Sequence, residues 1–168
     1  MAESDYETAL RADDRLDLRM WLRLLTCATM IEGRVRRRLR DSFDTTLPRF
    51  DVLAQLDRAP DGLTMGELSG RLMVSNGNVT ALVERLVREG LVDSRPRPDD
   101  RRVQRVRLTE SGRRQFARMA PANRAWIAAM TAGLSRDDMA RLYELLGRLK
   151  GSVSAADRRV EEGADGAV

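Results

Sequence analysis

The sequence predicts a mainly α-helical fold with six helices and one small β-hairpin. Apolar residues recur at spacings of three and four through most of the 168-residue chain, which is typical of amphipathic helices. Strand-like segments are confined to residues 91–95 and 105–108. No apolar run approaches the roughly 18 residues that a membrane span needs, and the polar residues 1–14 do not resemble a secretory signal. We therefore expect a cytoplasmic protein with no membrane partner.

The first helix is expected over about residues 14–43, after a flexible lead-in at residues 1–14. The apolar residues of this helix form a stripe and also occupy positions beside it. We therefore expect the helix to be buried on more than one side, against its own domain and against a second subunit. A basic block closes the helix, with arginine at positions 34, 36, 37, 38 and 40. The apolar stripe itself consists of Trp21, Leu24, Leu25, Ala28, Ile31, Val35 and Leu39.

A second helix is expected over residues 48–58, because its first residue, Pro48, suits an early helical position. A turn at residues 59–62 follows. The third helix then begins with a capping box, in which Thr64 caps the helix and Glu67 reaches back to it.

The fourth helix is expected over residues 76–89, with Ser75 as its cap and Gly90 just past its end. The two strands follow, joined by a charged hairpin tip. Two short helices, a tight turn between them and a hairpin after them make up a winged helix-turn-helix.

The fifth helix should start at Thr109 and run to about Thr131, with Pro121 kinking or breaking it. Ser135 caps a sixth helix, and the chain beyond Gly151 is expected to be frayed or disordered because it turns polar and small. The apolar stripe of the sixth helix consists of Met139, Leu142, Leu145, Leu146 and Leu149.

The start of the fourth helix is a candidate surface for reading DNA. In a helix-turn-helix, the N-terminal residues of the second helix meet base edges in the major groove. Small polar side chains there can approach closely, asparagine can pair with adenine, and the helix N-terminus can hold a phosphate. The alternative is an ordinary polar helix start. The candidates are Ser75, Asn76, Gly77, Asn78 and Thr80, with Arg85 further along.

The hairpin is rich in arginine, which occupies six of the thirteen positions 95–107. That density suits a finger along the phosphate backbone, where each neutralised phosphate releases counterion. An arginine at the tip can enter a narrow minor groove. A soluble hairpin, or a winged helix used only for protein contacts, would not need so many arginines. The candidate contacts are Arg95, Arg97, Asp100, Arg101 and Arg102.

Enzyme chemistry has little support in this composition. The chain has no histidine and a single cysteine, Cys27, which removes the commonest general base, the commonest metal ligand and any internal disulfide. The carboxylates fall mostly on solvated helix faces and near caps. We therefore expect no catalytic residue, no metal and no cofactor, and an enzyme remains the less favoured class.

Taken together, residues 64–72, 75–91, 99–102 and 107–113 resemble the MarR family of transcriptional regulators in order and spacing, over about residues 15–150. The motifs are specific as a set, although each is weak alone. The resemblance implies a homodimer that binds double-stranded DNA. Two-fold symmetry then predicts a pseudo-palindromic operator with half-sites about 10 bp apart.

The resemblance also assigns parts of the chain. Residues 15–43 and 109–150 would form a helical dimerisation region, residues 44–108 the DNA-binding domain, and residues 151–168 a polar tail. The Asp-x-Arg motif of the family's wing falls on Asp100 and Arg102, so that Arg102 would enter the minor groove and Asp100 would hold it in place.

Regulators of this family commonly release DNA when a small, often aromatic, ligand binds between the two parts, so we expect a repressor of this kind. Such a pocket would be lined by apolar side chains, for which an ordinary core position is the alternative. The candidates are Trp21, Leu25, Ala28, Phe50, Leu53 and Met119.

A narrower resemblance, over residues 21–27, 47–51 and 63–68, is to the regulators of aromatic-acid catabolism that respond to p-coumaroyl-CoA or benzoyl-CoA. It implies an aryl-CoA effector whose phosphates meet Arg34 and Arg38, although that basic block could equally contact DNA or solvent. A free phenolic or aromatic acid is an alternative effector. Redox sensing by Cys27 is an alternative mode of control, but the apolar neighbours of Cys27 favour a structural thiol.

Overall fold

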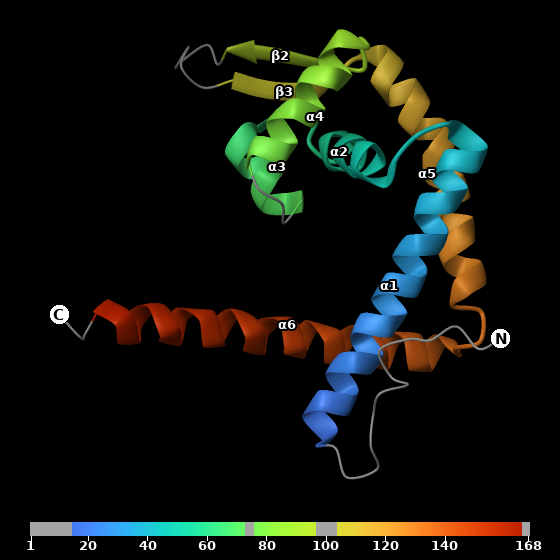
Figure 1. Ribbon diagram of the computed structural model, residues 1–168. Coiled ribbons are helices and arrows are strands. Elements are labelled where there is room, and N and C mark those ends of the chain that lie inside the picture. Colours follow the sequence, from blue (N-terminus) through green and yellow to red (C-terminus); the bar gives the residue numbers. More distant parts are fainter. Residues whose placement is uncertain (1–14, 73–75, 97–103, 166–168) are drawn as a thin grey trace. The chain divides into compact units, whose positions relative to one another are not determined.

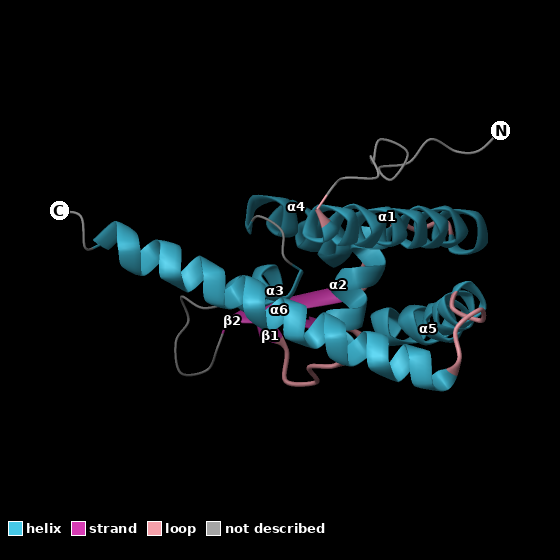
Figure 2. Cartoon of the chain, turned by 90° about the horizontal axis from the view of Figure 1, so that it is seen from below, coloured by secondary structure: helices cyan, strands magenta, loops and turns pink. Residues whose placement is uncertain are grey.

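A computed structural model describes residues 15–72, 76–96 and 104–165 of the chain. Helices dominate this part, and a small sheet accompanies them (Figure 2). The chain divides into two compact units, one reaching Ile127 and one from Ala128 onward. The predicted mainly α fold with six helices and a small β wing is confirmed. In order, the elements are α1 (Leu16–Phe43), α2 (Leu47–Asp57), β1 (Leu63–Thr64), α3 (Met65–Leu72), α4 (Asn76–Arg88), β2 (Val92–Pro96), β3 (Gln104–Leu108), α5 (Glu110–Met130) and α6 (Arg136–Asp165).

The core of the first unit lies where α2, α3 and α4 pack together beside the strands (Figure 1). Its side chains come from every element between α1 and β3, so a single apolar core holds the helix-turn-helix and the wing together. Each fully buried leucine of this kind contributes roughly 1.5–3 kcal/mol. The most buried members include Leu39, Val52, Leu53, Leu56, Leu68, Val79, Leu86 and Val106.

The sheet has three antiparallel strands in the order β1-β3-β2. The hairpin register pairs Val92 with Leu108 and Pro96 with Gln104. The strand β1, where Leu63 pairs with Val106, was not predicted. Two residues show no alternation, and the capping box that begins at Thr64 indicated a helix start instead.

Three predicted helix starts are confirmed by their hydrogen bonds. The Thr64 amide donates to Glu67 Oε2 at 2.7 Å and the Glu67 amide donates to Thr64 Oγ1 at 3.2 Å, which is the expected capping box. The backbone hydrogen bond from Thr64 lowers the pKa of Glu67. The hydroxyl of Thr109 accepts from the Gly112 amide, and that of Ser135 accepts from the Asp138 amide.

α5 packs against both α1 and α2 through aromatic rings. The Phe43 and Trp126 ring centroids lie 6.1 Å apart, and those of Phe50 and Phe116 lie 5.6 Å apart, distances typical of paired aromatic side chains. Of the two effects expected of Pro121, a break in α5 is wrong, since the helix continues through that residue, and a kink stays a prediction. Proline removes a single backbone hydrogen bond, and the turns on either side keep theirs.

The expected end of the sixth helix is also wrong. α6 continues through Gly151 to Asp165, where we expected a frayed tail. Neighbouring alanines such as Ala155 and Ala156 are strong helix formers, and the polar residues that follow do not prevent a helix.

Candidate nucleic-acid interface

α4 separates its side chains into a buried face and an exposed face. Val79, Val83 and Leu86 are buried in the core, while Asn78 and Thr80 are exposed. The exposed side chain of Arg85 lies further along the helix. At Asn78 and Thr80 this face of α4 is polar and exposed, which is compatible with contacts to base edges in a major groove. Asn76 and Gly77 form its first residues, and Ser75 lies outside the described residues.

The chain leaves α4 through a tight reversal that leads into the wing. Gly90 has φ +70°, a left-handed conformation that favours glycine. The Gly90 amide donates to the Val87 carbonyl and the Leu91 amide to the Leu86 carbonyl. Thr109 then donates its hydroxyl hydrogen to the Gly90 carbonyl at 2.7 Å, which ties the end of α4 to the base of the hairpin.

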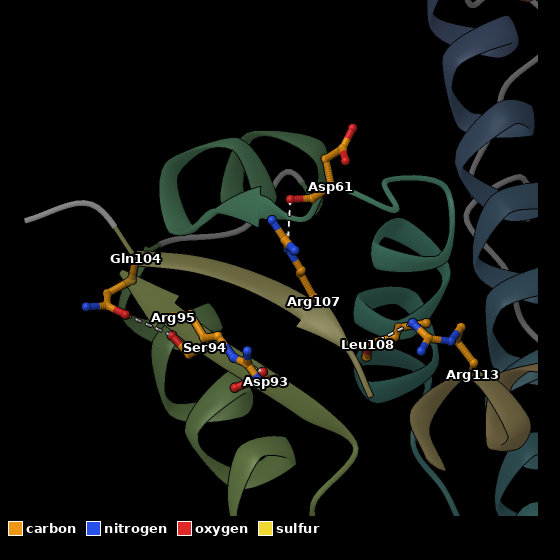
Figure 3. A network of polar contacts seen from close by, with 8 residues as sticks. All are labelled: Asp61, Asp93, Ser94, Arg95, Gln104, Arg107, Leu108 and Arg113. Carbon is orange, nitrogen blue, oxygen red and sulfur yellow. Dashed lines mark hydrogen bonds and ion pairs between the residues drawn. The ribbon is translucent and has the colours of Figure 1, made fainter. Parts of the chain in front are cut away.

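Two of the wing's six arginines anchor the wing. Arg107 Nε donates to the Asp61 carbonyl at 2.9 Å (Figure 3). Arg105 Nη1 donates to the same oxygen at 3.1 Å. Gly62 beside them has φ +80°, and a Cβ there would lie 2.5 Å from Arg107 Cγ. Both arginines therefore fix β3 to the turn before β1. Sequence reasoning counted them only as charge, although their alternation with Val106 and Leu108 already put them on the outer face of the strand.

The remaining arginine of the described wing, Arg95, has a solvent-exposed side chain that is engaged in an ion pair. Its side chain is 80% exposed and pairs with Asp93 at 2.5 Å (Figure 3). An exposed pair of this kind contributes little and is readily exchanged. The predicted contacts Arg97, Asp100, Arg101 and Arg102 lie outside the described residues, and their roles stay predictions.

A cavity of about 320 Å³ lies between α1, α2 and α5. Of the predicted effector residues, Ala28 and Phe50 line it. Its other walls are mainly apolar, with three polar side chains among them. The remaining lining residues are Ile31, Glu32, Val35, Leu47, Asp51, Asn123 and Ile127.

The other predicted effector residues lie elsewhere. Leu53, on the inward face of α2, is part of the core and is only 1% exposed. Met119 is buried and borders a separate hollow of about 350 Å³ between α1 and α5. Trp21 is exposed and Leu25 is half-buried near the start of α1. Cys27 is also exposed, so its apolar neighbours do not cover it within one chain.

The basic block of α1 is exposed at Arg34 and Arg38. The Arg38 guanidinium carbon lies 5.8 Å from the centre of the Trp126 ring, within cation–π range. Arg36 forms an ion pair with Glu32 and borders a second cavity of about 590 Å³. That cavity also touches α4 at Asn78, Val79 and Leu82.

Sequence reasoning missed the carboxylate between these cavities. Asp51 lines both of them, as does Glu32. Burial, and secondarily the negative charge of Glu32, raises the pKa of Asp51 to about 6. An aspartate within the apolar pattern of α2 was the available signal.

Metal and membrane sites find no support in the described ranges. No group of three or more cysteine, aspartate or glutamate side chains there could hold a metal ion. None of the helices in those ranges combines the length and the apolar character that a bilayer crossing demands.

Comparisons with known proteins agree with this geometry. The model of the MarR family matches residues 43–103. The transcriptional activatory protein BadR of Rhodopseudomonas palustris is 30% identical over 99% of this chain and 95% of its own. A mutant of Escherichia coli MarR, solved with operator DNA, is 27% identical over 81% of this chain and 99% of its own, with a TM-score of 0.67. PcaV of Streptomyces coelicolor, solved with its natural ligand, is 25% identical over 86% and 98%, with a TM-score of 0.65.

Proposed function

Because this chain belongs to the MarR family of transcriptional regulators, we propose that it binds a pseudo-palindromic duplex operator as a homodimer and releases it when a small aromatic ligand binds. Its relatives are regulators, and the chain is not an enzyme. The observation that carries the proposal is the exposed polar start of α4 beside a hairpin whose base is held by Arg105 and Arg107. Repression is the expected direction. The similar BadR is called an activatory protein, so a reporter assay should score both directions.

Operator binding can be tested by selecting bound fragments from the native genome and measuring affinity across a salt series. We expect a preferred pseudo-palindrome and steep salt dependence. Arg95→Gln should lower the slope of log affinity against log salt by about 1 per protomer if Arg95 contacts a phosphate. Charge reversal at Arg102 should abolish binding and leave the fold intact. A protein with no preference for any duplex over random sequence at moderate salt would refute the proposal.

The cavity that touches α4 supports control by a ligand. An occupant there would contact Asn78, a predicted DNA-reading residue, and Leu82 of the same helix. A ligand shifts the equilibrium only if it binds the DNA-incompetent state more tightly. Direct contact with α4 provides a physical source for such a difference.

The charge of the cavity walls favours an acyl-CoA thioester over a free acid. A free aromatic carboxylate would meet Asp51 and Glu32 at close range, and like charges repel. A thioester carbonyl is neutral and avoids that cost. The CoA phosphates need cations, for which Arg36 borders the second cavity and Arg34 and Arg38 lie on the same helix. We therefore propose an aromatic acyl-CoA as the effector, in the control of aromatic-compound catabolism.

The effector can be tested with benzoyl-CoA, benzoate and CoA alone. This set compares the complete thioester with its aryl part and its nucleotide part. We expect benzoyl-CoA to release the operator at a concentration at least about tenfold below that of benzoate, with CoA alone inactive. Equal potency of benzoate would favour a free acid. Failure of all three, with operator binding intact, would refute an aromatic acyl effector.

A further inference from the structure

An ion pair joins the start of α2 to the residue that follows α4. Arg49 Nη1 donates to Glu89 Oε1 at 2.7 Å, and Arg49 Nη2 donates to Glu89 Oε2. The two helices are in contact (Figure 1). The guanidinium therefore binds both oxygens of the carboxylate. Such a bidentate pair fixes the relative orientation of the two side chains as well as their separation.

This pair differs in burial and in sequence separation from the other ion pairs among the described residues. The Arg49 side chain is only 17% exposed, and the partners are 40 residues apart in sequence. The hydrogen bond from Arg49 lowers the pKa of Glu89, and the hydrogen bond to Glu89 raises the pKa of Arg49. By contrast, Arg114 and Glu110 form a pair within one turn of α5, and both are well exposed.

The position of Glu89 connects the two parts that would contact DNA. It lies between the last residue of α4 and Gly90, where the chain reverses toward β2. Thr109, at the far end of the hairpin, binds the Gly90 carbonyl. Arg49 consequently holds α2 to the junction between α4 and the wing.

We propose that Arg49 and Glu89 are positioning residues that set the orientation of α4 relative to the wing for sequence-specific binding. Base contacts require the side chains of α4 to be in register with the base pairs, whereas phosphate contacts tolerate displacement. Loss of the pair therefore lowers affinity for the operator more than affinity for random duplex. This inference rests on the operator binding proposed above.

Glu89→Gln gives a sharp test because two explanations predict opposite results. It removes a negative charge, so a purely electrostatic effect strengthens binding to any duplex. The positioning role instead lowers the ratio of operator affinity to random-duplex affinity, by about tenfold, the loss of one charge-assisted hydrogen-bonded pair. Glu110→Gln, which breaks the exposed pair in α5 with the same change in charge, is the matched control and leaves the ratio within about twofold of the wild type.

Arg49→Gln and the reversed pair Arg49→Glu/Glu89→Arg complete the design, with thermal melting to establish folding. We expect Arg49→Gln to lower the ratio and the reversed pair to restore it. The reversed pair decides the matter where a single variant does not fold, because a wild-type ratio supports the inference and a low ratio overturns it.

Other outcomes also decide. An unchanged ratio in Glu89→Gln overturns the inference while operator binding stands. An equal loss on both duplexes in Arg49→Gln makes Arg49 a phosphate contact and overturns it as well. A wild-type protein without operator preference overturns the proposed function, and this inference with it.

Discussion

Asp51 holds a carboxyl group where its charge is disfavoured. Its pKa is raised from 3.8 to about 6, first by burial and then by the negative charge of Glu32. Well below pH 3.8 the group is protonated in both the folded and the unfolded chain. Between about pH 4 and pH 6 the folded chain keeps a proton that the unfolded chain has released, so the free energy of unfolding falls as the pH rises.

Asp51→Asn should therefore stabilise the protein at pH 7.5 and have a much smaller effect near pH 4. Because Asp51 is partly exposed, solvent screening reduces the expected gain at pH 7.5 to about 1 kcal/mol. Urea unfolding at pH 4, 5, 6 and 7.5 measures it, with the exposed Asp57→Asn in the same helix as the control. A variant less stable than the wild type at pH 7.5 would show that the Asp51 carboxylate has a partner which outweighs its burial.

At the scale of elements, the join between α5 and the wing depends on one close approach. A Cβ on Gly112 would lie 2.0 Å from the Leu91 carbonyl oxygen, a backbone atom that cannot move aside alone. We expect Gly112→Ala to destabilise the protein by roughly 2–4 kcal/mol, since α5 must shift away from the backbone of Leu91, the residue before β2. Thermal melting checks this.

Gly70→Ala is the matched control for that substitution. Gly70 also lies in a helix, and a Cβ there has no neighbour within 4 Å. Alanine favours helix over glycine by roughly 0.5–1 kcal/mol, so this variant should be slightly stabilised. Equal melting temperatures for the two variants would mean that the approach at Gly112 is relaxed at no cost.

The elements that could be predicted are those determined by local sequence. The capping box of Thr64 and Glu67 and the cap at Ser135 involve partners three residues apart, so a short window contains all the information. The role of Arg107 could not be predicted in this way, because its acceptor at Asp61 is 46 residues away and is a backbone oxygen. The winged helix-turn-helix could be predicted from local sequence patterns. The hydrogen bonds that hold the wing to the rest of the domain join distant residues, so they become visible only in the folded structure.

The candidate site shows the same division. The polar start of α4 could be identified by subtracting the apolar face, and the structure leaves Asn78 and Thr80 exposed. The carboxylates at Glu32 and Asp51 were missed because they come together only when α1 meets α2. Helical spacing placed Phe50 on an inward face but could not distinguish a cavity wall from the core.

At the scale of the whole molecule, the exposed apolar side chains are the feature that a single chain does not explain. Leu142 and Leu145 of α6 are 45% and 48% exposed, and Trp21 of α1 is 51% exposed. A continuous exposed apolar stripe on a helix marks an interaction surface. A second copy of the chain is the partner that the proposed pseudo-palindromic operator requires.

Leu145→Glu should therefore convert the dimer into monomers, because it places a charge where an apolar partner surface would cover it. Operator affinity should then fall by about a hundredfold or more, since one protomer holds a single half-site. Light scattering and operator binding measure the two effects on the same sample. Ala140→Glu adds the same charge on roughly the opposite face of α6 and should leave both unchanged. If Leu145→Glu stays dimeric and binds the operator normally, the subunits meet through another surface, and the exposed stripe of α6 needs a different partner.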